Sequence, residues 1–145
     1  MKEYFRFEVE RFIRESKSWD ETLQRLALEL DSIPEISAMS GNPGKSSEVS
    51  NPTERIAINR HRVQVKIDKI RAKKDAFQFA WDRITPAEKE LITGFFFGEP
   101  GSIPAYIDKW CAKHSSNRKY CYQHRREALD EFSRYVVGYF RSKGY

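Results

Sequence analysis

The stretch that sets the fold covers residues 84–132 and reads ITPAEKELITGFFFGEPGSIPAYIDKWCAKHSSNRKYCYQHRREALDEF. Its first residues have the pattern of a capping box, with Thr85 at the N-cap, a proline at the first helical position and Glu88 three residues after the cap. This pattern predicts a short helix that runs through Phe97. The G-E-P-G sequence at 98–101 contains the residues that end helices and form turns, so we expect the helix to stop there.

Two further helices are predicted downstream. The first runs from Pro104 to about His114, and the second from a cap at Ser115 or Ser116 to about Arg141. Each has apolar residues at helical spacing, which gives it a side to bury. Short helix, glycine-rich turn, short helix, polar turn and basic helix is the element order of a helix-turn-helix module.

Upstream of this module, apolar residues recur in alternating steps of four and three, which predicts one buried side on each of two long helices. The interruption at Ser16 allows a break in the first helix, with Ser18 as the cap of its second part. The first set is Phe5, Val9, Phe12, Ser16, Trp19, Leu23, Leu26, Leu30 and Ile33. The second set is Ile56, Arg60, Val63, Ile67, Ile70, Lys74, Phe77, Trp81 and Ile84. Neither side can stay in water, so we expect an antiparallel helical hairpin or a coiled-coil dimer.

The chain therefore divides into four parts. Residues 1–33 form an N-terminal helical segment, and 34–51 form a flexible linker rich in proline, glycine and serine, without apolar periodicity. Residues 52–84 form the second long helix, which pairs with the first, and 85–145 form the helix-turn-helix module. No alternating strand pattern is found, so the predicted fold class is all-α.

Composition and charge exclude several classes of protein. Charged residues make up 32% of the 145 and aromatic ones 14%, which is too charged for a membrane protein and too aromatic for a disordered chain. No apolar run is long enough to span a membrane, the first residues do not form a signal peptide, and two cysteines do not make a secreted disulfide framework. We therefore expect a cytoplasmic protein.

The net charge of +5 is unevenly distributed. Residues 1–50 carry seven basic and ten acidic side chains, whereas residues 51–85 carry nine and four. Between Asp108 and Glu127 the chain has six basic and no acidic residues, which is its strongest local signal. This excess favours an anionic partner.

Residues 84–132 resemble the region-four-type helix-turn-helix of sigma factors, in the form found in phage late-gene activators of the RinA and ArpU kind. The residues that carry the resemblance are ITPAEKELI at 84–92, FFFG at 95–98 and YCYQHRREALDEF at 120–132. The family also has an N-terminal helical region, a polar linker and a second helix before the module. The chain differs from the family between the last two helices, where 111–117 predicts a turn about three residues longer and without glycine.

The final helix supports a DNA-binding interpretation on physical grounds. A helix fits the major groove, and the residues of its first turns reach base edges. Arginine binds guanine through two hydrogen bonds and glutamine does so with adenine, whereas serines and amides at a helix start bind phosphate. The predicted DNA-binding residues are Lys109, Lys113, Ser115, Ser116, Asn117, Arg118, Lys119, Tyr122, Gln123, Arg125 and Arg126. Base readout is assigned to Arg118, Lys119, Gln123 and Arg126, and phosphate contact to Lys109, Lys113 and Arg125.

Two other sites compete with this interpretation. All four ligands of a weak candidate zinc site are present at a spacing of C-x2-H-x6-C-x2-H, namely Cys111, His114, Cys121 and His124. The cysteines also fit the apolar sides of the helices as small buried residues, so no metal and no cofactor is predicted. The basic stretch at 60–74 is either a second nucleic-acid surface or the polar side of the hairpin, facing the acidic N-terminal segment. We favour the second reading.

No catalytic motif is found: the chain has no glycine-rich phosphate loop, no H-E-x-x-H and no G-x-S-x-G, so it is not predicted to be an enzyme. The predicted function is a DNA-binding transcriptional regulator. As the resemblance implies, it activates a phage late operon for packaging or lysis in a bacterial host cell by binding double-stranded promoter DNA, with host RNA polymerase as a further partner. The apolar sides of the long helices also allow a homodimer. The alternatives are a small-terminase-type DNA recognition subunit, which would form a ring of many copies, and a helical module that contacts polymerase. The sequence leaves open the operator, activation versus repression, the oligomeric state and the polymerase contact surface.

Overall fold

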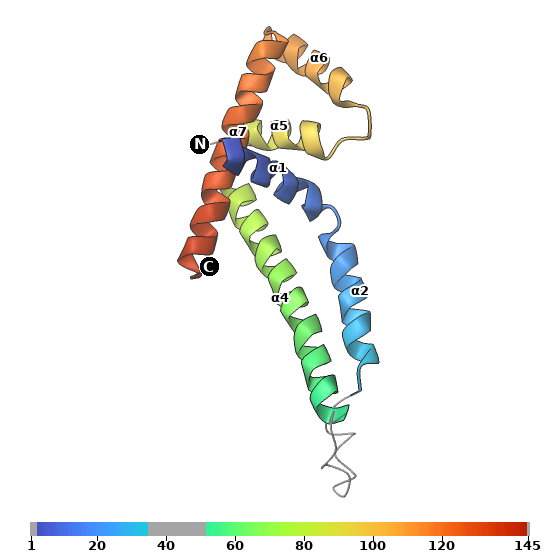
Figure 1. Cartoon of the computed structure of the whole chain (residues 1–145). Coiled ribbons are helices and arrows are strands. Elements are labelled where there is room, and N and C mark those ends of the chain that lie inside the picture. The colour runs from blue at the N-terminus through green and yellow to red at the C-terminus, as the bar shows by residue number, and fades with distance from the viewer. Residues whose placement is uncertain (1–2, 35–51, 145) are drawn as a thin grey trace, which may run out of the picture. The chain divides into compact units, whose positions relative to one another are not determined.

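The computed structural model describes residues 3–34 and 52–144, which form six helices and no strand (Figure 1). The fold class is therefore all-α, as predicted. The helices are α1 (Glu3–Ser16), α2 (Trp19–Ser32), α4 (Pro52–Arg83), α5 (Pro86–Phe96), α6 (Ile103–His114) and α7 (Arg118–Ser142). The predicted linker at 34–51 lies outside the described residues, apart from Pro34. No described helix is long and apolar enough to cross a membrane.

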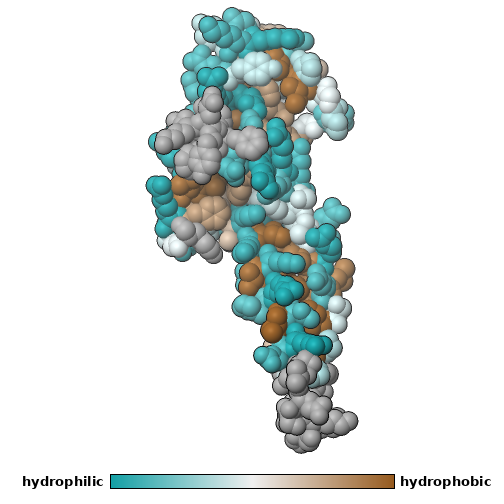
Figure 2. All heavy atoms as spheres, in the orientation of Figure 1, coloured by the Kyte–Doolittle hydropathy of each residue, from teal (hydrophilic) through white to brown (hydrophobic). Residues whose placement is uncertain are grey.

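The described residues fall into two units. The first contains residues 3–17 and 75–144, and the second contains residues 18–34 and 52–74. In each, hydrophilic side chains cover most of the face drawn in Figure 2, with apolar patches between them. The break that Ser16 allows in the first long helix is present. Helix α1 ends at Ser16, and α2 begins at Trp19, with Ser18 at its N-cap position.

In the second unit, α2 packs against the first part of α4. Leu26 of α2 is buried together with Val63 and Ile67 of α4. Because Asp20 at the start of α2 pairs with Lys74, and Ile33 at its end accepts a hydrogen bond from Arg60, these two segments run in opposite directions.

In the first unit, α7 packs against α1, α5 and α6. Phe132 lies at the centre of this core with no exposed surface, and its ring centroid is 5.1 Å from that of Phe77 and 6.5 Å from that of Phe12. Val9 and Ile13 of α1 belong to the same core. The side of α1 that the sequence assigns to the hairpin therefore also contributes to the core around α7.

The capping box predicted at the start of α5 is confirmed. The Thr85 hydroxyl accepts a hydrogen bond from the Glu88 backbone N–H, and the Glu88 carboxylate accepts one from the Thr85 N–H. These two bonds satisfy helix amides that would otherwise have no partner, and they fix the first turn of α5.

Close packing between α5 and α6 depends on the absence of a side chain at Gly94. A Cβ at this position would lie 2.1 Å from the ring of Tyr106. The same ring packs edge-on against Phe95, with centroids 5.5 Å apart. A residue larger than glycine therefore forces α6 away from α5.

We predict that Gly94→Ala lowers the free energy of unfolding by about 1–3 kcal/mol, because the added methyl overpacks the contact with Tyr106. Gly138→Ala is the matched control, since a Cβ at this position in α7 meets nothing within 4 Å. Alanine is the better helix former, so the control variant keeps or gains stability. Urea denaturation of both variants measures the difference. Equal stability of the two variants would contradict the close approach of Tyr106.

Candidate nucleic-acid interface

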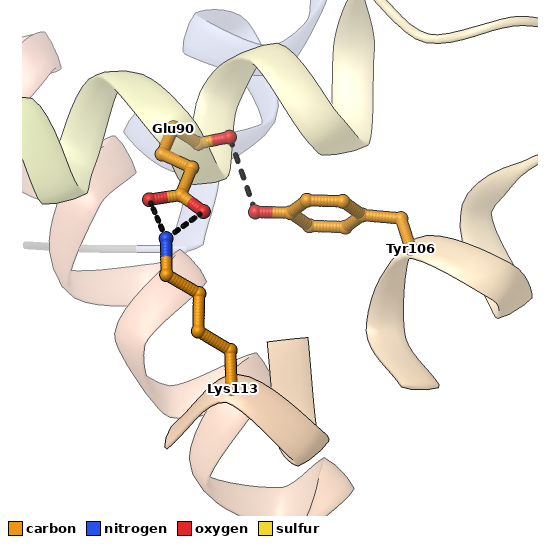
Figure 3. Close-up of polar contacts among 3 residues, drawn as sticks. All are labelled: Glu90, Tyr106 and Lys113. Carbon is orange, nitrogen blue, oxygen red and sulfur yellow. Dashed lines mark hydrogen bonds and ion pairs between the residues drawn. The ribbon is translucent and has the colours of Figure 1, made fainter. Parts of the chain in front are cut away.

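Helices α5 and α6 are held together by Glu90, which binds two residues of α6 (Figure 3). The Tyr106 hydroxyl donates a hydrogen bond of 3.1 Å to the Glu90 backbone carbonyl. The Lys113 ammonium lies 3.0 and 3.3 Å from the two carboxylate oxygens of Glu90. Burial, the Glu90 carboxylate and the nearby Cys121 sulfur raise the pKa of Tyr106 from 10.0 to about 12, so its hydroxyl remains a donor to a more alkaline pH than that of a free tyrosine.

The connection between α6 and α7 is shorter than the sequence predicts. Helix α6 continues through His114, so the turn consists of residues 115–117 alone. Ser115 has φ 48° and ψ 47°, the left-handed conformation that glycine commonly adopts at the end of a helix. The Ser116 N–H donates to the Cys111 carbonyl at 3.0 Å, which closes the end of α6. The longer turn at 111–117 is therefore wrong, whereas the helix end predicted at about His114 is confirmed, because residues 111–114 belong to α6.

The cap of α7 is also different from the one predicted. Asn117 occupies the N-cap, and its side-chain oxygen accepts a hydrogen bond of 3.1 Å from the Tyr120 N–H. Ser115 and Ser116 instead belong to the turn, so neither caps the helix. Helix α7 begins at Arg118, two residues after the start expected near 116.

Three of the predicted base-reading residues share one exposed side of α7. Lys119, Gln123 and Arg126 line a shallow hollow of about 330 Å³ together with Glu127 and Asp130. The cationic groups of Lys119 and Arg126 form no ion pair within the described residues. This side of α7 therefore presents two cations and an amide to a ligand. Glu127 and Asp130 are the acidic residues that border the cations.

Two other predicted cations are exposed but paired. Arg118 lies 3.0 Å from the Asp108 carboxylate, and the hydrogen bond to this group raises the pKa of Arg118. Lys113 is paired with Glu90, whereas Lys109 of α6 is exposed and forms no ion pair in the described part of the chain. Exposed pairs of this kind contribute little stability, so Arg118 and Lys113 can exchange their carboxylates for phosphates at small cost.

Arg125 does not belong to the exposed side. Its guanidinium pairs with Glu10 of α1, and the side chains of both residues are only about 20% exposed, at 22% and 19%. The guanidinium carbon also lies 5.1 and 5.3 Å from the ring centroids of Phe95 and Phe96. Arg125 therefore links α7 to α1 and α5, and it is not free to meet a phosphate.

Two tyrosines lie in the first turns of α7. Tyr122 is 48% exposed and its ring centroid is 6.0 Å from that of Phe95, so part of the ring packs against α5. Tyr120 is 50% exposed, and sequence analysis did not assign it to the site. Its position between the exposed Lys119 and the buried Cys121, about 100° around the helix from the cysteine, is the signal that identifies it as an exposed aromatic.

The candidate zinc ligands do not form a metal site. No group of three or more His, Cys, Asp or Glu residues suited to a metal ion occurs within residues 3–34 and 52–144. Cys121 is fully buried, whereas the rings of His114 and His124 pack on Trp110 with centroids 4.4 and 5.5 Å apart. The four residues therefore serve the packing of α6 against α7.

No protein-family model, curated protein sequence or solved structure matches this chain.

Arg125 and Arg126 are adjacent in sequence, but we predict that only the replacement of Arg125 destabilises the fold. Arg125→Ala lowers the free energy of unfolding by about 1–3 kcal/mol, because it leaves the half-buried Glu10 carboxylate without its partner. Arg126→Ala changes the free energy by less than about 0.5 kcal/mol, because the side chain is exposed. Urea denaturation at pH 7 distinguishes the two. Equal losses would mean that the Arg125–Glu10 pair does not hold α7 to α1.

The raised pKa of Tyr106 predicts a loss of stability at alkaline pH. The folded state favours the neutral phenol, so this contribution is complete below pH 10 and disappears as the pH rises through about 12. Tyr106→Phe removes a hydrogen bond and lowers stability by about 1 kcal/mol at pH 8. The difference in the free energy of unfolding between wild type and Tyr106→Phe then shrinks as the pH rises from 10 to 12, which urea unfolding at a series of pH values measures. A constant difference over this range would show that the hydroxyl is not buried against Glu90.

Proposed function

We propose that the chain is a sequence-specific DNA-binding transcriptional regulator, with α6, the turn at 115–117 and α7 as its helix-turn-helix. The observation that carries the proposal is the exposed side of α7, where Lys119, Gln123 and Arg126 lie within the first three turns after the Asn117 cap. Helix-turn-helix proteins place the N-terminal residues of their second helix against base edges. The three-residue turn supports the assignment, because three to four residues is the usual length.

In this proposal the residues of α6 and α7 have two roles. Arg126 and Gln123 read base edges in the major groove, with Lys119 beside them, because arginine and glutamine each offer a two-bond contact to guanine or adenine. Lys109 and Lys113 contact phosphates and set the orientation of the helix on the duplex. Arg118, which the sequence assigns to base readout, joins them in this proposal, because its guanidinium is paired with Asp108 of α6. Arg125 is left out of the interface, because its partner is Glu10.

The remaining parts of the resemblance belong to the same proposal. Within the second unit, residues 18–33 and 52–74 act as an antiparallel helical hairpin that serves stability, dimerisation or polymerase contact. The regulator activates a phage late operon, as the likeness of 84–132 to late-gene activators implies. The pairing of α2 with α4 in opposite directions supports the hairpin.

The experiment is a selection of preferred duplexes from a random pool, followed by competition between the selected duplex and random DNA. We predict that Arg126→Ala weakens binding to the selected duplex by about 1–3 kcal/mol and relaxes the preference at one base pair. Arg141→Ala, which removes an exposed arginine near the other end of α7, leaves the preference unchanged.

Three outcomes would contradict the proposal in different ways. If Arg126→Ala weakens binding equally for all DNA sequences, Arg126 contacts a phosphate and does not read a base. Affinity for every duplex without any enriched sequence removes base readout. Assembly of the free protein into a ring of many subunits favours a packaging subunit over a regulator.

A further inference from the structure

Six of the eight cations of α4 within the second unit fall into two groups. Arg60 donates to the backbone carbonyls of Leu30 and Ile33, at 3.4 and 3.0 Å, and Lys74 pairs with Asp20. These two basic side chains therefore face α2 and help to hold it. Lys74 is the part of the basic stretch that meets the acidic N-terminal segment, as sequence analysis expected for the whole stretch.

The second group forms what we call the basic stripe, which consists of Arg55, Arg62, Lys66 and Lys69. Their spacings of seven, four and three residues place all four on one side of α4, within an arc of about 60° at 100° per residue. The stripe is about 21 Å long at a rise of 1.5 Å per residue. All four side chains are exposed.

The stripe has no counter-charge in the described part of the chain. None of its four cations forms an ion pair there. The nearest acids on the same helix, Glu54 and Asp68, lie roughly 100° or more around the axis from the centre of the stripe. Asp68 also accepts a hydrogen bond of 2.9 Å from Gln64, on the side away from the stripe. Four like charges on one rigid helix repel one another, so the surface gains free energy when an anion covers it.

The composition of this side of α4 favours a nucleic-acid backbone over an acidic protein. The cores of protein–protein interfaces are depleted in charge and enriched in aromatic residues, whereas this side presents four cations beside one exposed apolar residue, Ile58. Phosphate contacts need only lysine and arginine. Along the axis, the cations are separated by about 10, 6 and 4.5 Å, a range comparable to the spacing of one to three nucleotides on a DNA strand.

We propose that the basic stripe binds the phosphate backbone of double-stranded DNA without reading its sequence. This surface lies outside residues 85–145, and its binding requires no base contact by α7. Each phosphate contact releases a counterion, so the stripe contributes affinity that decreases steeply with salt. A regulator with such a surface holds any duplex long enough to search it.

The test compares two variants of the full chain that lose the same charge. The stripe variant is R55Q/R62Q/K66Q/K69Q, and the control is R25Q/R71Q/R141Q/K143Q, which replaces four exposed cations elsewhere. Binding to a random-sequence duplex is measured between 50 and 200 mM salt. We expect the slope of log K against log salt to become shallower by about 3 for the stripe variant, and by less than about 1 for the control. Affinity at 50 mM salt falls at least about tenfold for the stripe variant.

Circular dichroism and urea unfolding of both variants establish that the helices remain intact. For the half-variants R55Q/R62Q and K66Q/K69Q we expect about half of the change in the slope of log K against log salt. These variants keep the test valid if the fourfold variant unfolds. An unchanged slope, or an equal change in the control, overturns the proposal and leaves the stripe as a solvated or protein-binding surface. Failure of base readout by α7 is a separate result, because it removes the preference for a selected duplex and leaves the effect of the stripe on random DNA.

Discussion

The contact between Tyr106 and Gly94 is the constraint on which the proposed interface depends. The tyrosine ring lies so close to α5 that only glycine fits beneath it, and its hydroxyl donates to the Glu90 carbonyl one turn earlier. This contact fixes α6 on α5, and the exposed Lys113–Glu90 pair beside it adds little. Only three residues separate the end of α6 from the start of α7. The position of α6 therefore also determines where the first turns of α7 lie.

Helix α7 combines a core role and a surface role along its length. Leu129 and Phe132 are fully buried, whereas Lys119, Gln123 and Arg126 point away from that core in its first half. The contrast is sharpest at two neighbours: Arg125 pairs with Glu10 of α1, and Arg126 is exposed without a partner among the described residues. A rigid core on one side of the helix holds the exposed side in a fixed orientation, which is what base readout requires.

The sequence predicts the helices well because their signals are local. The capping box at Thr85, the glycine-rich turn after α5 and the apolar spacing of α7 each lie within a few residues. The end of α6 at about His114 is predicted correctly, but the cap of α7 is not, because Ser115, Ser116 and Asn117 are all good caps and the sequence alone does not choose among them. The role of Arg125 was missed because its partner is 115 residues away in the sequence. The two groups of α4 cations likewise become distinct only when α2 is placed against them.

The most direct test of the account is to map the DNA contact on the protein by NMR. Backbone amide shifts are compared with and without a duplex selected from a random pool. The account predicts the largest shift changes between Asn117 and Arg126, smaller changes along the basic stripe and little change at the buried residues Leu129, Phe132 and Val136. If the duplex binds and the shifts of residues 117–126 do not change, α7 does not read DNA.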